Sequence, residues 1–317
     1  MAPLVLLLRG GRPGRPVPRR LRRAWPPLHG VRIGSGHVFQ APGACPPYPA
    51  DRGRLDEVRA QGADRRSGTG RPGRCRCTPA WPGRAAFTGT LVHSGRYRSG
   101  AEYRGTDVLV VGAGNSGAEI AVDLVEQGAS RVRLSIRRPP NVVLRTVAGI
   151  PSQLVSILLT RLPLSLADAV ARATARLTIG DPRKLGLPAP DRGIYTEMVR
   201  DRQIPIIDVG LVSALRAGRV EIVPAVEGFD GPAVRLLGGE SIRPDVVVAA
   251  TGFRPSLEPL VGHLGVLGEH GLPRGHGETQ VPGAPGLHFI GFSNPPTGNL
   301  REMAIDARRI ARRVAGS

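Results

Sequence analysis

The sequence of 317 residues contains few cysteines, few aromatic residues and no long apolar run. No stretch of eighteen consecutive apolar residues occurs, so no transmembrane segment is predicted. The LVLLL run at residues 4–8 is too short for the apolar region of a signal peptide, and arginines follow it instead of preceding it, so we predict a cytoplasmic protein. The cysteines, Cys45, Cys75 and Cys77, do not indicate a disulfide framework, and the C-x-C spacing of the last two is typical neither of redox nor of zinc sites.

Lysine is almost absent, because arginine supplies nearly all of the positive charge. The formal net charge is +19, and Lys184 is the only lysine among 44 basic residues. Residues 1–84 hold 17 arginines against 4 acidic residues, whereas residues 85–317 hold 27 basic against 21 acidic residues. Because phosphate-binding surfaces use lysine as well as arginine, this distribution is more typical of GC-rich coding bias than of a nucleic-acid surface. We therefore predict no nucleic-acid partner.

Glycine and proline interrupt residues 1–84 every few positions, and no helical or strand period persists there. Such a segment cannot bury enough apolar surface to offset the conformational entropy that folding costs. Two interpretations stay open: a disordered basic tail, or coding sequence translated out of frame, with the true frame regained near Trp81. A glycine-rich strand–turn–helix pattern in another upstream reading frame would support the second interpretation, and its absence would exclude it.

A strand–turn–helix–strand pattern begins at residue 107. Residues 107–111 (DVLVV) suit a buried parallel strand, residues 116–127 have the apolar period of a helix, and residues 131–136 (RVRLSI) alternate as the next strand. A G-x-G-x-x-G loop joins the first strand to the helix, which in this context predicts a dinucleotide site more strongly than a purely structural turn. Its backbone is expected to approach a pyrophosphate at the helix N-terminus. The predicted binding residues of the loop are Gly112, Ala113, Gly114, Asn115, Ser116 and Gly117.

The end of the second strand distinguishes NAD from NADP. An NAD site places an acidic residue there to hold the ribose 2′-hydroxyl, whereas an NADP site uses arginine. This chain has Arg137 and Arg138 at that place, with no acidic residue nearby. A solvated basic face is the alternative interpretation, but the pattern favours NADP.

The rest of the chain is predicted to alternate helical and extended segments. Residues 151–180 have a helical apolar face interrupted by Pro163, which is interpreted as a core or substrate-lining insertion in preference to a membrane-surface helix. A proline- and glycine-rich connector follows at 181–192. The later predicted elements are strands at 220–223, 233–237, 245–249 and 287–290, and a helix at 300–314.

Several stretches resemble the flavin-containing monooxygenase family. Residues 87–97 match its F-x-G-x-x-x-H-S-x-x-Y motif, at the usual distance before a G-x-G-x-S-G loop. Residues 249–255 (AATGFRP) resemble the A-T-G element at which the chain passes back into the flavin domain. Residues 287–293 and the following helix resemble the closing strand and helix of that domain. The IPIIDVG and TIGDPRKLGL segments are similar to YUCCA-like members, so the chain is identified as a bacterial member of that branch with an atypical or frame-shifted N-terminus.

The resemblance implies an α/β fold with two Rossmann-like dinucleotide-binding domains, the FAD domain being incomplete at its N-terminal side. It implies FAD and NADP as cofactors, with NADPH reducing FAD and a flavin C4a-hydroperoxide transferring oxygen from O₂ to a small nucleophilic or carbonyl substrate. Further cofactor-binding residues are Thr251 and Gly252 in the A-T-G element, Gly291 after the last strand, and Leu300 at the start of the helix that approaches the flavin. No catalytic side chain or metal ligand is predicted, and His93 is assigned a hinge role.

The same resemblance divides the chain into four parts. Residues 1–84 form the arginine-rich segment, 85–104 a linker, 105–208 the NADP domain with its helical insertion, and 209–317 the C-terminal part of the FAD domain. Two alternatives stay open beside the monooxygenase: a flavin-dependent NADPH reductase without oxygenation, and a non-catalytic NADP-binding remnant that has lost its FAD site. The oligomeric state and the substrate's identity are not predicted.

Overall fold

The computed structural model describes residues 4–7, 31–33, 36–39 and 74–315. The chain divides into two compact units, which are described separately. Of the described residues, the larger unit comprises Arg76–Gly252, and the smaller unit comprises residues 4–7, 31–33, 36–39, 74–75 and 253–315. The division follows Gly252, at the end of the A-T-G element, and residues 208 and 209 both belong to the larger unit.

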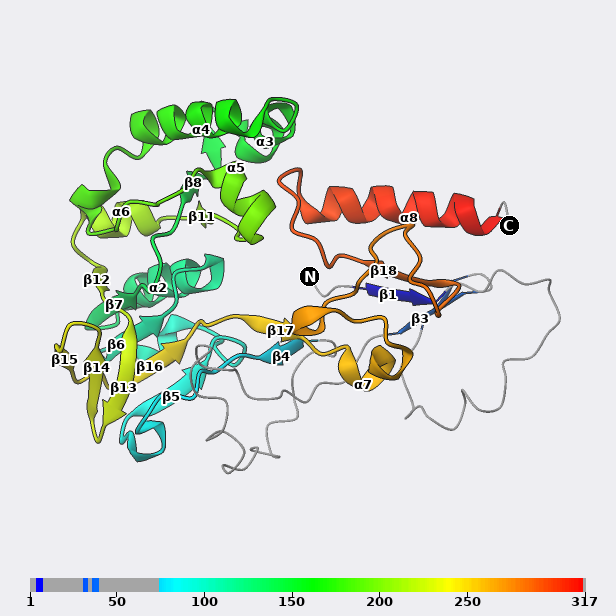
Figure 1. The fold of residues 1–317 in the computed structure, drawn as a ribbon. Coiled ribbons are helices and arrows are strands. Elements are labelled where there is room, and N and C mark those ends of the chain that lie inside the picture. The colour runs from blue at the N-terminus through cyan, green and yellow to red at the C-terminus, as the bar shows by residue number, and fades with distance from the viewer. Residues whose placement is uncertain (1–3, 8–30, 34–35, 40–73, 316–317) are drawn as a thin grey trace. The chain divides into compact units, whose positions relative to one another are not determined.

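A five-stranded parallel sheet forms the centre of the larger unit (Figure 1). Its spatial order is β12-β7-β6-β16-β5, so the first strand of the βαβ pattern lies in the middle. The strands are β5 (Thr90–His93), β6 (Asp107–Val111), β7 (Arg131–Ser135), β12 (Glu221–Val223) and β16 (Val246–Ala249). Because β16 pairs in parallel with both β6 and β5, residues 209–252 cannot belong to another domain. The predicted strands are confirmed to within one residue at each end.

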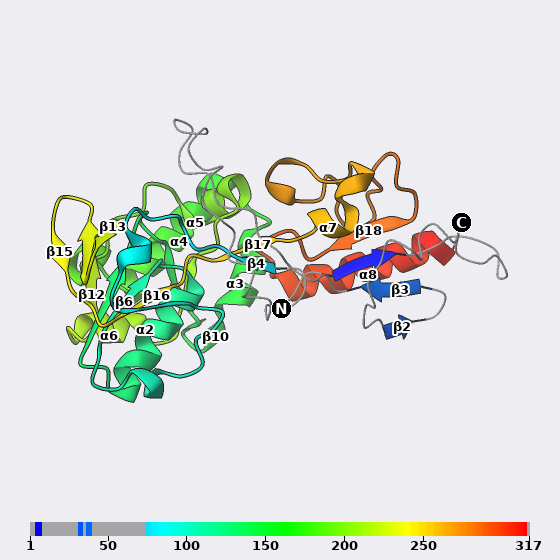
Figure 2. The ribbon, with the colours of Figure 1, turned by 90° about the horizontal axis from the view of Figure 1, so that it is seen from below.

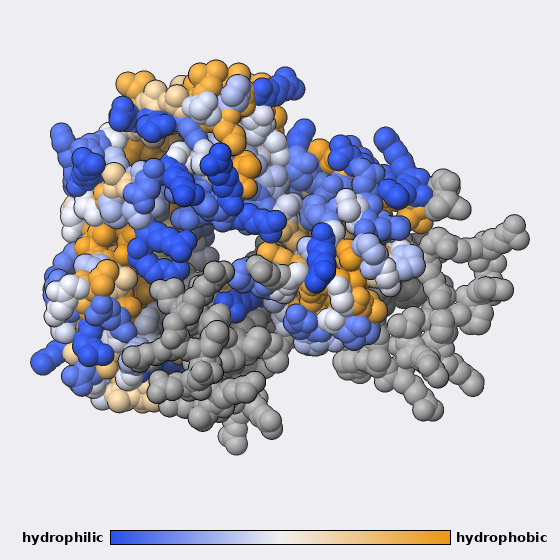
Figure 3. Space-filling model, viewed as in Figure 1, coloured by the Kyte–Doolittle hydropathy of each residue, from blue (hydrophilic) through white to orange (hydrophobic). Residues whose placement is uncertain are grey.

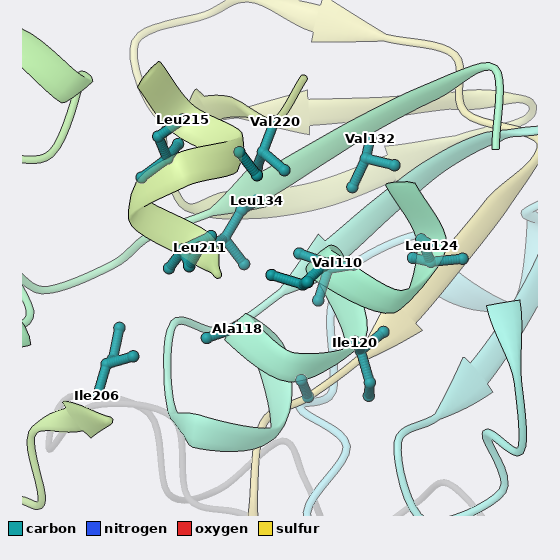
Figure 4. Packing of buried hydrophobic residues seen from close by; sticks show 14 of the residues in the cluster. Val110, Ala118, Ile120, Leu124, Val132, Leu134, Ile206, Leu211, Leu215 and Val220 are labelled. Atoms are coloured by element: carbon teal, nitrogen blue, oxygen red, sulfur yellow. The ribbon is translucent and has the colours of Figure 1, made fainter. Parts of the chain in front are cut away.

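Alternating side chains of the strands build a core on each face of this sheet. On one face, Val108 and Val110 of β6 pack against α2 (Asn115–Gln127) and α6 (Leu211–Arg216), as Figure 4 shows for the centre of this cluster. On the other face, Leu109 and Val111 pack against an antiparallel meander. The meander consists of β13 (Val226–Asp230), β14 (Ala233–Leu236) and β15 (Ser241–Ile242). Figure 2 shows the sheet between these two layers.

A helical insertion separates β7 from the rest of the larger unit. It begins at β8 (Val142–Leu144) and ends at β11 (Ile206–Asp208), and these two strands pair in parallel. Between them lie β9 (Thr146–Val147), β10 (Ile150–Pro151), α3 (Ser152–Leu159), α4 (Leu164–Thr178), η4 (Pro182–Leu185), α5 (Ile194–Thr196) and the π-helical turn η5 (Glu197–Asp201). The predicted interruption at Pro163 is confirmed, because α3 ends before it and α4 begins after it.

The predicted apolar face of the insertion is not a core. The side chains of Leu154, Leu158, Leu162 and Leu166 are 54%, 61%, 39% and 49% exposed. The buried side of α4 is formed instead by small and polar residues, among them Ala167 and Asp168. Apolar periodicity therefore located the helices correctly. Of the two interpretations of their apolar face, a core is wrong for these leucines, and a substrate-lining surface stays a prediction.

The smaller unit holds an antiparallel sheet of order β18-β1-β3-β2. Its strands are β1 (Leu4–Leu7), β2 (Val31–Ile33), β3 (Gly36–Phe39) and β18 (Leu287–Ile290). The other elements are β4 (Arg74–Arg76), whose last residue belongs to the larger unit, β17 (Phe253–Pro255), α7 (Glu258–Val261), η6 (Gly262–Leu264), η7 (Glu269–Gly271) and α8 (Asn299–Ala315). Short strands thus occur within residues 1–84, where none was predicted, and the other residues of that segment up to residue 73 lie outside the described part.

The α/β class is confirmed, and the parallel sheet of the larger unit is that of a Rossmann-like domain. In the smaller unit, β1 pairs antiparallel with β18, which is not the parallel pairing of a complete dinucleotide-binding sheet. None of the described helices is long and apolar enough to cross a membrane.

Candidate dinucleotide-binding site

The glycine loop turns at the carboxyl end of β6, and two of its glycines have no room for a side chain. Gly112 has φ +112°, and a Cβ atom there would lie 2.6 Å from the carbonyl oxygen of Ala250. A Cβ atom on Gly117 would overlap the carbonyl oxygen of Gly112, because α2 begins directly against the loop. Both glycines are therefore required by the close approach of β6, α2 and the end of β16.

Gly114 differs from these two glycines, since a Cβ atom there would meet nothing within 4 Å. It is exposed and serves as the N-cap of α2, with no side chain capping the helix and no acidic residue in its first turn. The N–H groups of Asn115, Ser116 and Gly117 begin the helix and have no intrahelical acceptor. An uncapped helix N-terminus with open space before it is suited to bind an anion.

This helix N-terminus lies where the strand order of the sheet reverses. From β6 the chain proceeds to β7 on one side, whereas β16, which returns later, pairs on the other side. The loop is tied to both neighbours, because Gly112 donates its N–H to Ser135 (3.0 Å) and Ala250 donates to Val111 (2.9 Å). Ligands of open α/β sheets bind at such a reversal, outside the carboxyl ends of the strands.

The sequence also places two arginines at this edge of the sheet. Arg137 and Arg138 are exposed directly after β7, and neither forms an ion pair within the described part of the chain. The arginines on β7 itself are different. Arg131 and Arg133 pair with Glu221 at 2.7 and 3.4 Å, and Arg133 also pairs with Asp107 at 2.6 Å. Unlike the two arginines on β7, Arg137 and Arg138 thus keep a charge that no carboxylate offsets.

Asn115 has a side-chain role that the sequence did not reveal. Its Nδ2 donates to the carbonyl oxygen of Pro205 (3.2 Å), and its Oδ1 accepts the N–H of Ile207 (2.7 Å). The amide therefore holds β11, the last strand of the insertion, against the loop. Because the two segments are about 90 residues apart in the chain, no local pattern could have indicated this contact. Ser116 is exposed and Ala113 is half-buried beside it.

The histidine of the F-x-G-x-x-x-H-S-x-x-Y motif forms structural hydrogen bonds. His93 Nδ1 accepts the N–H of Gly95 (3.0 Å), so Nε2 carries the proton and donates to the carbonyl oxygen of Gly252 (3.1 Å). Burial lowers the pKa of His93, with Arg76 contributing in the same direction against the opposing effect of the Gly252 bond. The neutral ring therefore joins the end of β5 to the A-T-G element.

The tyrosine of the motif fixes the opposite flank of α2. Tyr97 donates its hydroxyl to Asp123 Oδ2 (2.6 Å), which also accepts the N–H of Gly100 (2.7 Å). Its ring stacks on Tyr103 at 5.6 Å. Burial and the Asp123 bond raise the pKa of the Tyr97 hydroxyl. The motif is thus explained by contacts that hold β5 and α2 in place, and it requires no role in the chemistry.

The A-T-G element is held by backbone and hydroxyl bonds. Thr251 donates its Oγ1 to the carbonyl oxygen of Cys77, and the N–H of Cys77 donates to Gly252 (3.1 Å). Because these bonds occupy the hydroxyl of Thr251 and the carbonyl oxygen of Gly252, a ligand at this element would contact the other backbone groups. This element follows β16 directly and therefore lies next to the glycine loop.

The two remaining predicted residues belong to the smaller unit. Gly291 follows β18 in the left-handed region, with φ +83°. Leu300 is 59% exposed in the first turn of α8. Next to it, the Oδ1 atom of Asn299 is buried without a hydrogen-bond partner, which is unusual for a buried amide oxygen and indicates that a donor is missing there.

Neither a metal site nor the pocket at the end of α2 accompanies the glycine loop in the described part of the chain. No group of three His, Cys, Asp or Glu side chains in the described part of the chain is arranged to hold a metal ion. A pocket between α2 and the start of β7, lined by Val125, Ser130 and Arg219, lies at the amino ends of the strands and therefore opposite the glycine loop. The loop edge, and not this pocket, has the chemistry of a nucleotide site.

Comparison with known proteins identifies relatives of this chain. The family model described as flavin-binding monooxygenase-like matches residues 76–262. Indole-3-pyruvate monooxygenase YUCCA8 of Oryza sativa subsp. indica is 36% identical over 243 residues, which cover 75% of this chain and 57% of the relative. The probable indole-3-pyruvate monooxygenase YUCCA1 of Arabidopsis thaliana is 32% identical over 235 residues, covering 74% of this chain and 56% of the relative.

A solved structure supports the fold. The OTEMO complex with FAD and NADP superposes with a TM-score of 0.51 at 15% identity, covering 76% of this chain and 58% of that chain. The chain spans just over half the length of the curated relatives that it matches. The matched family region contains the glycine loop, the two arginines and the A-T-G element. The chain belongs to the flavin-binding monooxygenase-like family.

Proposed function

We propose that this chain binds NADP(H) at the N-terminus of α2 and forms the NADPH-binding part of a flavin monooxygenase. The observation that carries the proposal is the combination of an uncapped helix N-terminus, open at Gly114, with two unpaired arginines after β7. The helix dipole and the orphan N–H groups suit the pyrophosphate. Arg137 and Arg138 suit the 2′-phosphate, because guanidinium groups form charge-assisted hydrogen bonds with phosphate oxygens.

FAD is the second proposed cofactor, with Thr251, Gly252, Gly291 and Leu300 as its contacts in this chain. The buried, unpartnered Oδ1 atom of Asn299 supports a ligand at the start of α8, since a hydrogen-bond donor would satisfy it. Bound together, the two cofactors would supply hydride transfer to the flavin and activation of O₂ for the oxygenation of a small-molecule substrate. The start of α8 would favour negative charge on the flavin ring, because a helix N-terminus carries a partial positive charge.

The proposed substrate is a small carbonyl compound. The relatives are named as indole-3-pyruvate monooxygenases, so indole-3-pyruvate is the first compound to assay. No side chain of the larger unit is proposed as a general acid or base, because His93 is neutral and both of its ring nitrogens form hydrogen bonds within the fold.

A second candidate function is NADP binding without flavin chemistry. It is favoured by the antiparallel pairing of β1 with β18, because a complete FAD-binding sheet would place parallel strands there. The glycine loop and both arginines belong to the larger unit and do not depend on that pairing. The two candidates thus agree on NADP and differ on FAD.

Calorimetric titration with NADP⁺ and NAD⁺ tests the NADP site. Arg137→Gln and Arg138→Gln are each expected to weaken NADP⁺ binding about tenfold or more, because a hydrogen bond to a charged group contributes about 1.5–3 kcal/mol. NAD⁺, which lacks the 2′-phosphate, should bind both variants as it binds the wild type. Arg243→Gln, an exposed arginine on the meander side, is the matched control. Equal losses for both nucleotides, or no loss, would contradict the assignment.

Flavin absorbance separates the two candidates. Monooxygenase function predicts that the purified chain is yellow or becomes so with added FAD, that NADPH bleaches the bound flavin, and that indole-3-pyruvate is consumed with O₂. A chain that binds NADP⁺ but stays colourless after reconstitution would establish the second candidate. If NADPH is oxidised without an oxygenated product, the chain is a reductase and the monooxygenase proposal is wrong.

A further inference from the structure

The insertion of the larger unit carries an apolar surface that its own fold does not cover. Large apolar side chains of α3, α4 and the turn between them are exposed, as the patch over these helices in Figure 3 shows. We define this surface, the insertion patch, by six residues: Leu154, Leu158, Leu162, Leu166, Val170 and Leu177. Their exposed fractions range from 38% for Val170 to 87% for Leu177. Contiguous apolar surface on one side of a helix pair indicates that something covers it.

The patch cannot turn inward, because α4 is held by its opposite side. Asp168 is buried, and its Oδ1 accepts the N–H of Tyr195 (2.7 Å) while its Oδ2 accepts the hydroxyl of Thr196 (2.5 Å). These bonds join α4 to α5. Leu166, Val170 and Leu177 recur at helical spacing on the side away from Asp168, so the same bonds direct them to solvent.

The exposed charged residues between positions 144 and 180 all have one sign. Arg145, Arg161, Arg172 and Arg176 are exposed, and none forms an ion pair within the described part of the chain. The only acidic residue between positions 144 and 180 is Asp168, whose carboxylate is buried and fully used. The segment that carries the exposed leucines therefore also carries four exposed arginines and no exposed carboxylate, and the nearest exposed carboxylate along the chain, Asp181, follows α4.

We propose that the insertion patch docks on the surface of an anionic lipid bilayer, with the leucines of α3 and α4 in the interface and the arginines at the phosphate level. Helices that lie in the membrane surface combine exposed leucines with flanking basic residues, and each basic side chain near anionic lipid strengthens binding. A second copy of this chain fits the charges less well. A twofold contact would place each patch against itself, so arginines would face arginines.

Tryptophan fluorescence on the full chain tests the contact at the patch itself. This local readout is needed because residues 1–84 contain 17 arginines and could bring the protein to anionic vesicles on their own. Leu162→Trp places a probe in the patch, and Leu237→Trp places one at a comparably exposed leucine of the meander (39% and 58% exposed). Both are measured against the wild type, with vesicles of phosphatidylcholine alone and of seven parts phosphatidylcholine to three parts phosphatidylglycerol, with and without brominated acyl chains.

The expected result is that brominated lipid quenches L162W but not L237W, and only in vesicles that contain phosphatidylglycerol. Arg172→Gln with Arg176→Gln should then lower the vesicle affinity measured from L162W quenching about tenfold or more, since about two basic contacts are lost. Arg235→Gln with Arg243→Gln, a matched pair of exposed arginines on the meander, should leave it unchanged.

Two outcomes would overturn the proposal. If the protein sediments with the vesicles and L162W is not quenched, the lipid contact lies elsewhere. If sedimentation equilibrium without lipid shows a dimer that Leu166→Gln dissociates, a second copy covers the patch. All substituted positions are exposed, so their unfolding temperatures should match that of the wild type, which makes either outcome interpretable.

Discussion

Two glycines of the same loop should respond in opposite ways to the same added methyl group. Gly114→Ala places its Cβ in open space with φ −95°, so the free energy of unfolding should change by less than about 0.5 kcal/mol. The methyl group then occupies the space in front of the α2 N-terminus. If the pyrophosphate approaches there, losing one charge-assisted hydrogen bond of about 1.5–3 kcal/mol weakens NADP⁺ binding about 10- to 100-fold.

Gly117→Ala should instead destabilise the fold. Its Cβ would overlap the carbonyl oxygen of Gly112, so backbone must move, and such overpacking costs about 1–3 kcal/mol or more. Because the overlapped atom belongs to the backbone, the cost lies at the upper end of that range, and alanine's better helix propensity recovers about 1 kcal/mol of it. The expected net loss is about 2 kcal/mol. That corresponds to about 4–8 °C in the unfolding temperature for a domain of this size.

Differential scanning fluorimetry and NADP⁺ calorimetry on both variants make the test. Gly114→Ala should bind NADP⁺ more weakly at an unchanged unfolding temperature. Gly117→Ala should have a lower unfolding temperature. Unchanged NADP⁺ affinity in Gly114→Ala would refute the placement of the pyrophosphate at this loop. Unchanged stability in Gly117→Ala would refute close packing as the reason for that glycine.

Three further outcomes are expected. Burial lowers the pKa of His93, so the folded state binds fewer protons than the unfolded state, and the free energy of unfolding should fall as the pH drops through the ordinary histidine range. Urea titrations at pH 7 and pH 5 should show a smaller fall for His93→Gln than for the wild type. Asn115→Ala should weaken NADP⁺ binding and speed proteolysis near residue 205, because two hydrogen bonds of about 1 kcal/mol each are lost. Tyr97→Phe should lower the free energy of unfolding by about 1 kcal/mol, because its hydrogen bond to Asp123 is lost. Asp123→Asn should lower it less, because the amide oxygen can still accept the Tyr97 hydroxyl.

Local patterns were sufficient to predict the central strand–helix–strand unit of the larger unit. Residues 107–136 were assigned correctly because strand, turn and helix each depend on neighbours within a few positions. The parallel pairing followed from the βαβ unit, and the arginines after β7 followed from the strand's end. The predicted helix end at residue 127 is confirmed, and Gly128 caps α2 in the left-handed region with φ +90°.

Contacts between distant segments were beyond the same reasoning. The bridge from Asn115 to β11 joins positions about 90 residues apart, and the bond from His93 to Gly252 joins positions about 160 apart. The leucines of α3 and α4 were assigned to a core or to a substrate-lining surface, because apolar residues are usually covered, but the Asp168 bonds turn the opposite side of α4 inward. The antiparallel pairing of β1 had no local signal, since glycine and proline dominate its surroundings.

The strand order of the parallel sheet also determines when it can form during synthesis. β5 is the edge strand and pairs with β16, and β16 is the last strand of this sheet to leave the ribosome. β6, α2 and β7 can associate early, because they are close in the chain. The nascent chain must therefore keep an unpaired β5 soluble until residues 246–249 insert between it and β6, and in that interval β5 is the part of the chain most open to pairing with another chain.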